Sequence, residues 1–279
     1  MLQEMGVRVW LPGTAFAPED APAQTTQTVQ MPRPTPAPLP RAASAAPPER
    51  SATTSHVVTP RAADVPPVLA PHAPGSTPLA LEGLDWPALA DAAASCQACG
   101  LCAGRKLATL QAPAQAQQAD WFFVGDPPDE DEDRQGAPFV GPAGQLLDNM
   151  LKAMGARRGE GGASGAYVTN IVKCRPPQGR LPQADEMAQC ADYLRRELAL
   201  VQPKVIVVMG RSAIQHLLSE HPDATGLPLG KQRGVVYRYA GLPVVVTYAP
   251  TILLRATADK AKAWADLCLA LDVRAGISP

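Results

Sequence analysis

The sequence predicts an α/β fold, namely a three-layer α/β/α sandwich with a central, mainly parallel four-stranded sheet, preceded by a disordered N-terminal extension. Three observations support this prediction. Short apolar runs rich in valine and aromatic residues are typical of parallel strands that are buried on both faces. Segments with apolar residues at helical spacing separate these runs, so strand and helix alternate. The N-terminal part, in contrast, is rich in proline and alanine and shows no periodicity.

The composition divides the chain into three parts. Residues 1–14 form a short, partly apolar segment that is too short to fold alone, and we expect it to dock on the domain or on a partner protein. Residues 15–80 form a linker dominated by Pro, Ala, Ser and Thr, which lacks the apolar side chains of a core and is expected to be disordered. Residues 81–275 are expected to form one domain, which is long enough to bury a core without disulfides.

The predicted elements of this domain follow one another in a regular order. The runs predicted as strands are Trp121 to Gly125, Ala166 to Val172, Val205 to Gly210, and Pro243 to Tyr248. The segments predicted as helices are Gly144 to Met154, Ala184 to Leu200, Arg211 to Ser219, and Lys260 to Leu271. Ligands of doubly wound sheets bind outside the carboxyl ends of the strands, so the residues after each strand are the candidates for a functional site.

Charge and hydropathy exclude some classes of protein. The formal net charge of −1 gives no overall basic excess, so any contact with nucleic acid must come from a local patch. No apolar run approaches the length that spans a bilayer, and Glu4 interrupts the N-terminal apolar pattern where a signal peptide has a basic region and an apolar core. We therefore expect a soluble, cytoplasmic protein with no membrane partner.

The six cysteines favour a metal site over a disulfide framework, because no export signal is recognised. Cys96 and Cys99 form a C-x2-C pair, and Cys174 and Cys190 form a wider pair. Four thiolates can enclose either zinc or an iron–sulfur cluster. The sequence does not contain the series of closely spaced cysteines that is typical of bacterial ferredoxins, because Lys106 stands where that series requires a cysteine. Zinc stays open, and an ordinary buried role for Cys174 or Cys190 is the remaining alternative.

Four motifs in chain order carry a family resemblance. They are CQACGLC followed by Arg105, EDRQGAPFVGPAGQLLD from Glu132 to Asp148, TNIVKCRPP from Thr169 to Pro177, and LLR from Leu253 to Arg255. With these motifs the stretch from Cys96 to Arg255 resembles the family 4 uracil-DNA glycosylases, the iron–sulfur type. The resemblance implies that a [4Fe-4S] cluster is the cofactor and that its ligands are Cys96, Cys99, Cys174 and Cys190.

The resemblance also implies a set of site residues for a DNA-repair enzyme that flips uracil out of DNA and hydrolyses its N-glycosidic bond. They are Gly125, Asp126, Pro127, Phe139, Asn170 and Arg255. Asp126 would be the catalytic carboxylate near the sugar, Phe139 would stack on uracil, and Asn170 would bond its polar edge through an amide that both donates and accepts. Arg255 would contact a phosphate. Without the surrounding motifs, the simpler interpretations are that Phe139 is a core aromatic residue, Asn170 a turn residue and Arg255 a solvated surface charge.

Two motifs depart from the family pattern. In GDPPD, Asp126 replaces the usual glutamate, so the carboxylate is on a shorter side chain. Asp129 replaces the usual glycine and is the first residue of the acidic sequence DEDED. In APTILLR, Ala249 replaces the histidine that would steady the departing uracil anion. Tyr248 and Thr251 are the candidates for a substitute hydroxyl.

These departures leave three hypotheses. The first is a uracil-DNA glycosylase with reduced activity or a shifted base preference, acting as a monomer on single- or double-stranded DNA. The second is a degenerate glycosylase that binds uracil or abasic sites without cutting, and Ala249 supports it best. The third is a scaffold protein that acts through the linker and the N-terminal segment and no longer binds DNA. Cleavage, retention of uncut DNA with steep salt dependence, or neither would distinguish them.

Overall fold

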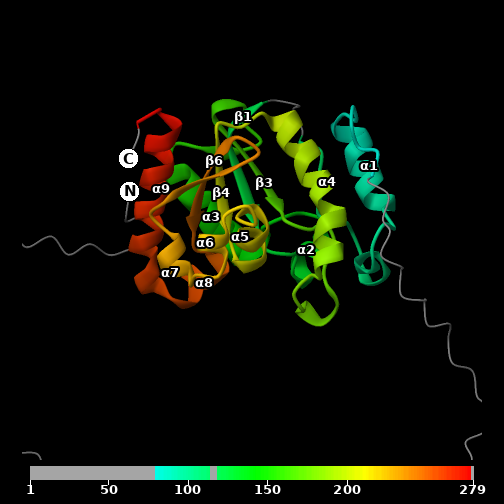
Figure 1. Ribbon diagram of the computed structural model, residues 1–279. Helices are drawn as coiled ribbons and strands as arrows, with labels where there is room; N and C mark the ends of the chain where they lie inside the picture. The colour runs from blue at the N-terminus through cyan, green and yellow to red at the C-terminus, as the bar shows by residue number, and fades with distance from the viewer. Residues whose placement is uncertain (1–78, 114–117, 278–279) are drawn as a thin grey trace, which may run out of the picture. The chain divides into compact units, whose positions relative to one another are not determined.

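The computed structural model describes residues 79–113 and 118–277. The predicted N-terminal segment, residues 1–14, and nearly all of the predicted linker, residues 15–80, lie outside the described residues. The described part has helices around a central sheet, as the alternating pattern predicts (Figure 1). None of its helices is long and apolar enough to cross a membrane.

The sheet of the described part has six strands in the order β2-β3-β1-β4-β6-β5. Every neighbouring pair is parallel except β5 and β6. The strands are β1 (Ala119–Gly125), β2 (Arg157–Arg158), β3 (Gly162–Asn170), β4 (Val205–Met209), β5 (Val236–Tyr239) and β6 (Leu242–Thr247). The four predicted strands are confirmed, but the predicted number of four was wrong. Both additional strands are short edge strands without a buried apolar run, so the sequence pattern does not reveal them.

The four predicted helices are confirmed to within a few residues, and the structure adds shorter ones. The α-helices are α1 (Trp86–Ser95), α2 (Glu130–Gln135), α3 (Gly141–Ala153), α4 (Ala184–Val201), α5 (Arg211–Leu217), α6 (Pro222–Thr225), α7 (Leu229–Gln232), α8 (Pro250–Arg255) and α9 (Lys260–Arg274). Three 3₁₀ turns cover Gly100–Gly104, Pro177–Gly179 and Thr257–Asp259. Most of the additional helices have six residues or fewer, which is too short for a helical period to appear in the sequence.

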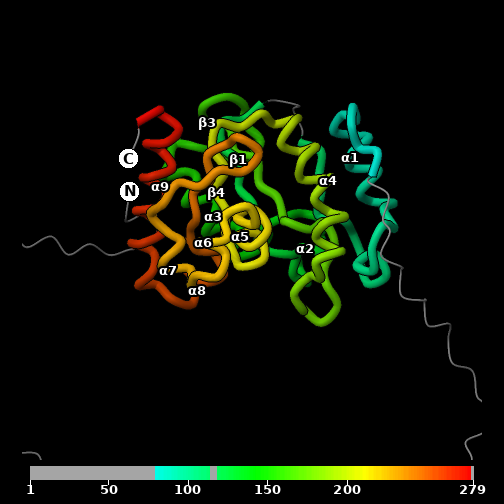
Figure 2. Tube along the Cα trace, in the orientation of Figure 1, coloured from blue at the N-terminus to red at the C-terminus, as the bar shows by residue number. Residues whose placement is uncertain are grey.

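Two hydrophobic cores lie on opposite faces of the sheet, which confirms the three-layer arrangement. Alternate residues of the central strands enter different cores, so Phe122 packs with α1, α4 and α5 while Phe123 packs with α3, α8 and α9. In both views α1 and α4 lie on one side of the sheet and α9 on the other (Figure 1 and Figure 2). Both faces of the central strands are therefore covered, which is why these strands read as continuous apolar runs.

The strand order places a topological switch point between β1 and β4. The chain leaves β1 toward β3 on one side, and it leaves β4 toward β6 on the other side. The loops that follow β1 and β4 therefore diverge and leave a crevice at the carboxyl ends of these neighbouring strands. Asp126 is the first residue after β1, and Gly210 is the first residue after β4.

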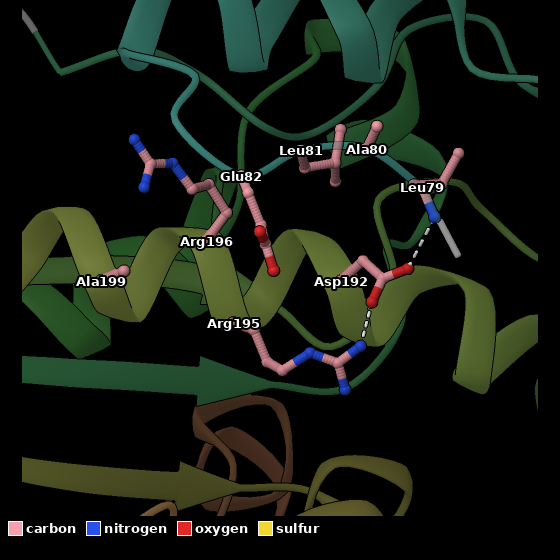
Figure 3. A pocket seen from close by; sticks show the side chains of 8 residues that line it. All are labelled: Leu79, Ala80, Leu81, Glu82, Asp192, Arg195, Arg196 and Ala199. Atoms are coloured by element: carbon pink, nitrogen blue, oxygen red, sulfur yellow. Dashed lines mark hydrogen bonds and ion pairs between the residues drawn. The ribbon is translucent and has the colours of Figure 1, made fainter.

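The start of the described domain is anchored to the outer face of α4. The backbone N–H of Leu79 donates to Oδ2 of Asp192 (3.0 Å), and Arg195 pairs with the same carboxylate. Arg196 donates to the backbone oxygen of Leu84. Figure 3 shows the pocket of about 530 Å³ that these contacts enclose. None of the predicted site residues lines it.

Candidate active site and thiol cluster

A buried carboxylate, that of Glu132 in α2, connects the carboxyl ends of β1 and β3. Its Oε2 accepts a hydrogen bond from the backbone N–H of Asp129 (2.7 Å), and the Asp129 side chain caps the same helix in return. Its Oε1 accepts from the backbone N–H of Phe139 and from Nδ2 of Asn170 (3.3 Å). Burial raises the pKa of Glu132, and the hydrogen bonds from Asp129 and Phe139 oppose this rise. The sequence pattern does not mark Glu132 as a site residue, because only the tertiary structure shows which residues its carboxylate joins.

Phe139 is held in a backbone conformation that few non-glycine residues adopt. Its φ is 52°, and such a conformation costs about 1–3 kcal/mol unless its surroundings impose it. Here Glu132 fixes the N–H, while the Arg158 guanidinium donates to the backbone oxygens of Pro138 (3.1 Å) and Phe139 (3.2 Å). The ring lies against Gly125, where any Cβ would overlap it. Gly125 therefore makes room for this ring.

Asn170 is the last residue of β3 and lies beside Gly125 in the parallel register. Its Nδ2 donates to the backbone oxygen of Asp126 (3.0 Å) and to Oε1 of Glu132 (3.3 Å), so both amide hydrogens are used. Its Oδ1 is buried and has no hydrogen-bond partner. A buried acceptor without a partner is costly, so a ligand that brings a donor would satisfy this oxygen.

The Asp126 carboxylate spans the switch point between β1 and β4. Its Oδ1 accepts from the backbone N–H of Ser212 (2.8 Å), and its Oδ2 accepts from that of Arg211 (3.1 Å), both in the first turn of α5. Gly210 has a φ of 98°, and a Cβ there would overlap the carboxylate. Burial raises the pKa of Asp126, although the backbone hydrogen bonds lower it in part. The sequence located this carboxylate, but not its function as a cap of α5.

A pocket of about 280 Å³ opens beside Asp126, and we call it the site pocket. Its walls are the loop after β1 and the loop that follows Cys174. The lining residues are Asp126, Pro127, Pro128, Asp129, Glu130, Arg175, Pro176, Gly179, Arg180, Leu181 and Ser212. Arg175 reaches across to Glu130 (3.4 Å), so its charge is partly compensated. Phe139 and Asn170 do not line this pocket, although Asn170 is bonded to the backbone of Asp126, which does.

The residues after β6 supply little polar chemistry. Ala249 is buried at the start of α8, where no side chain caps the helix. The ring of Tyr248 lies 4.8 Å from the guanidinium of Arg233, which is itself paired with a carboxylate of α9. Thr251 is exposed on α8. Arg255 ends α8 and is exposed, and its side chain makes no hydrogen bond or ion pair with another described residue.

A buried ion pair fixes the end of β3. Lys173 Nζ donates to Oε2 of Glu197 (2.7 Å), to Oγ1 of Thr169 (2.7 Å) and to the backbone oxygen of Asn170 (2.8 Å). Tyr167 donates to the other oxygen of Glu197 (2.9 Å). All three donors of the lysine are therefore satisfied, as a buried charge requires. This network sets the position of Asn170 and of the cysteine that follows Lys173.

Four thiols from distant parts of the chain gather next to this network. Cys96 and Cys99 follow α1, Cys174 follows β3, and Cys190 lies in α4. Burial is the main cause that raises the pKa of Cys99 to about 11 and that of Cys190 to about 12, and the nearby Cys174 thiol contributes to both shifts. The Arg105 guanidinium donates to Sγ of Cys174 (3.2 Å) and is held by the backbone oxygens of Ala93 (3.2 Å) and Ala94 (2.6 Å).

The described residues show no ready site for a single metal ion at these thiols. Within residues 79–113 and 118–277, no three His, Cys, Asp or Glu side chains are arranged around a single ion position. A single zinc ion needs every sulfur about 2.3 Å from the metal. A cluster binds its thiolates on its outside, so its ligands stand farther apart. Cys102, which sequence analysis did not assign to the site, also lies near enough to raise the pKa of Cys174.

Comparison with known proteins places the chain in a family. The family model of the Uracil DNA glycosylase superfamily matches residues 113–268. A type-4 uracil-DNA glycosylase of Archaeoglobus fulgidus is 38% identical over 165 residues, which cover 57% of this chain and 78% of the relative. Type-4 uracil-DNA glycosylases of Sulfurisphaera tokodaii and Saccharolobus solfataricus are each 35% identical, and the matches cover 57% and 60% of this chain and 71% and 76% of those relatives. The chain belongs to the uracil-DNA glycosylase superfamily and, within it, to the type-4 uracil-DNA glycosylases.

Proposed function

We propose that this protein is a DNA-repair glycosylase that hydrolyses the N-glycosidic bond of uracil in single- or double-stranded DNA. The observation that carries the proposal is the joint fixation of Phe139 and Asn170 by Glu132, with Oδ1 of Asn170 left without a partner. A flipped base needs a ring on which it can stack, and a donor on its pairing edge needs an acceptor. Phe139 and Oδ1 of Asn170 would supply these two groups.

The hydrogen bonds of Asn170 give a reason for base selection. Both amide hydrogens are committed within the protein, so the side chain offers only an acceptor. The N3 atom of uracil carries a hydrogen and can donate to that acceptor, whereas N3 of cytosine is itself an acceptor. Binding cytosine would leave two buried acceptors face to face, which is costly. The site therefore favours uracil over the base from which it arises by deamination.

In the reaction the bond between C1′ of the sugar and N1 of uracil breaks, water supplies hydroxide to C1′, and uracil departs as an anion that then takes the proton. We assign the stabilisation of the cationic sugar to the Asp126 carboxylate, which three backbone N–H groups hold in place and which lines the site pocket with Pro127. The exposed guanidinium of Arg255 is assigned to a DNA phosphate.

The uracil anion lacks one donor that the family provides. Ala249 stands at the histidine position, and the ring of Tyr248 is engaged with Arg233. Loss of one such donor costs about 2.7–4 kcal/mol of transition-state stabilisation, or roughly a hundred- to a thousandfold in rate. The same observation favours the second candidate function, a protein that recognises uracil in DNA and does not cut it.

Restoring the donor distinguishes the two functions. We expect the wild-type protein, in excess over a labelled uracil-containing oligonucleotide, to release uracil slowly, and Ala249→His to release it about a hundredfold faster. Ile252→His, at an exposed position of the same helix, serves as the control and should match the wild type. Release by Ala249→His alone would establish the binding function for the natural protein. Release by neither, with no retention of the oligonucleotide, would refute both.

We further propose that Cys96, Cys99, Cys174 and Cys190 hold a [4Fe-4S] cluster. The donor set fits such a group, because four thiols meet in a largely buried place beside a cationic side chain and two backbone donors, the N–H groups of Leu101 and Lys173. When bound, the cluster would cross-link three distant segments and fix the loop between Cys174 and Cys190, which forms one wall of the site pocket.

Arg105 provides a test of this assignment that is independent of activity. Arg105→Gln removes the positive charge that faces Cys174 Sγ, so we expect less iron per protein after aerobic purification and faster bleaching of the visible absorption of the cluster in air. Arg157→Gln, an exposed arginine far along the chain, is the matched control. Equal iron content and equal bleaching rates in both variants would contradict the placement of the cluster at Cys174, beside Arg105.

A further inference from the structure

A second pocket adjoins the site pocket at the end of β4, and we call it the flank pocket. Its volume is about 380 Å³. The lining residues are Leu181, Pro182, Ala184, Met187, Ala188, Ser212, Gln215, His216 and Ser219. Leu181 and Ser212 line both pockets, so the flank pocket continues directly from the site pocket. None of its residues belongs to the predicted site or to the thiol cluster.

The flank pocket has an apolar wall and a polar wall, and no aspartate, glutamate, lysine or arginine lines it. Leu181, which is 54% exposed, and Met187 belong to the apolar side. The polar side is α5, which contributes Ser212, Gln215 and His216. Burial lowers the pKa of His216, so its imidazole is neutral at physiological pH.

Ser212 supplies an independent sign of a ligand. Its side chain is buried, and its Oγ has no hydrogen-bond partner although its backbone N–H is bonded to Asp126. The Gln215 side chain also makes no hydrogen bond with another described residue. Unpaired buried hydroxyls are uncommon in native structures, because they lose solvation without compensation. The Ser212 hydroxyl, which can both donate and accept a hydrogen bond, therefore lies between the two pockets without a partner.

This lining selects an uncharged, flat ligand with polar edges. A phosphate or a cation would find no counter-charge in the pocket, whereas a nucleobase can pack its face on Leu181 and Met187 and turn its polar edge toward α5. Enzymes that act on flipped bases also contact the neighbouring nucleotides.

We propose that the flank pocket binds the base of a nucleotide adjacent to the flipped uridine. The proposal rests on the proposed function, since the position of the flipped nucleotide defines its neighbour. Leu181 and Ser212 line both pockets, so the flank pocket begins where the site pocket ends. A base next to the flipped uridine can therefore enter the flank pocket. The protein thereby reads the base beside uracil as well as uracil itself.

Fluorescence anisotropy with labelled single-stranded oligonucleotides tests the proposal. One oligonucleotide carries a single non-cleavable uridine analogue between two normal bases, and two others replace the base on the 5′ or the 3′ side with an abasic spacer. We expect one of the two replacements to weaken binding to the wild type about 5- to 100-fold, the effect of losing one stacked base.

Two matched variants of α4 decide whether the flank pocket is responsible. Ala188→Phe fills the pocket from an exposed helix position, and Ala199→Phe adds the same side chain on the outer face of α4. We expect Ala188→Phe to bind the normal and spacer oligonucleotides equally, and Ala199→Phe to retain the wild-type difference. Ser212→Ala, which removes the unpaired hydroxyl, should reduce that difference while leaving thermal stability unchanged or higher.

The results separate this proposal from the proposed function. Wild-type binding that depends on uracil but not on either neighbouring base would overturn the flank-pocket proposal alone, as would an unchanged difference in Ala188→Phe. If the protein neither cuts the uracil-containing oligonucleotide nor binds it better than a thymine control, the proposed function fails, and the flank-pocket proposal fails with it.

Discussion

Replacing Lys173 with methionine is expected to lower the free energy of unfolding by about 3–5 kcal/mol, because it leaves a buried charge without its partner. Glu197 is 0% exposed, and its remaining donors are the hydroxyls of Tyr167 and Thr169. Those neutral donors do not replace an ammonium group 2.7 Å away. Urea unfolding followed by circular dichroism measures the loss.

Two further variants make this test specific. Lys204→Met breaks a surface ion pair with Asp120 (3.1 Å) and should cost less than about 1 kcal/mol, since exposed pairs contribute little. Adding Glu197→Gln to Lys173→Met removes the unpaired charge and should recover part of the stability. A Lys173→Met protein within 1 kcal/mol of the wild type would show that the pair does not carry the assigned energy.

Replacing Glu132 with glutamine is expected to slow uracil release about a hundredfold, since displacements of about 1 Å at a reacting group have effects of this size. Glu132 Oε1 accepts from both Phe139 and Asn170, and Oε2 accepts from Asp129. An amide has one oxygen, so in either orientation its NH₂ group faces a donor. The Phe139 loop or the Asn170 side chain must then move. Single-turnover release of uracil from a labelled oligonucleotide measures the effect.

Asp131→Asn is the matched control, because it makes the same chemical change on the exposed face of α2. It should leave uracil release within about twofold of the wild type, consistent with the small contribution of exposed pairs. A proportionate fall in activity in both variants would mean that the charge of the acidic run matters and the position of Glu132 does not. Thermal unfolding of both proteins separates a loss of positioning from a loss of fold.

The central strands and the long helices were predictable, while the edges of the fold were not. Strand β4 is a run of apolar residues because helices cover both of its faces, and α4 shows a helical period because one side packs on the sheet. Strand β5 is half exposed, and α8 has six residues, so neither leaves a periodic pattern. Such elements form because of what they pack against, and their own sequence carries little information about them.

The predicted site shows the same division. Motif positions predicted Asp126, Phe139 and Asn170 as site residues, and the structure brings these residues together at the ends of β1 and β3. The cap that Asp126 places on α5 and the position of Tyr248 beside Arg233 could not be read from the motifs. These contacts join residues that are far apart in the chain, and a linear pattern does not record such distances.

The sequence by itself determined the fold class, the pairs of cysteines and the two altered motifs, because each depends on residue type and spacing along the chain. The tertiary structure alone decided which polar atoms are paired. It shows that Glu132 joins Phe139 to Asn170, that Lys173 is neutralised by Glu197, and that the hydroxyl of Ser212 has no partner. The physical reason is that hydrogen bonding and desolvation depend on distances of a few ångströms between side chains, and folding sets these distances between segments that the sequence keeps apart.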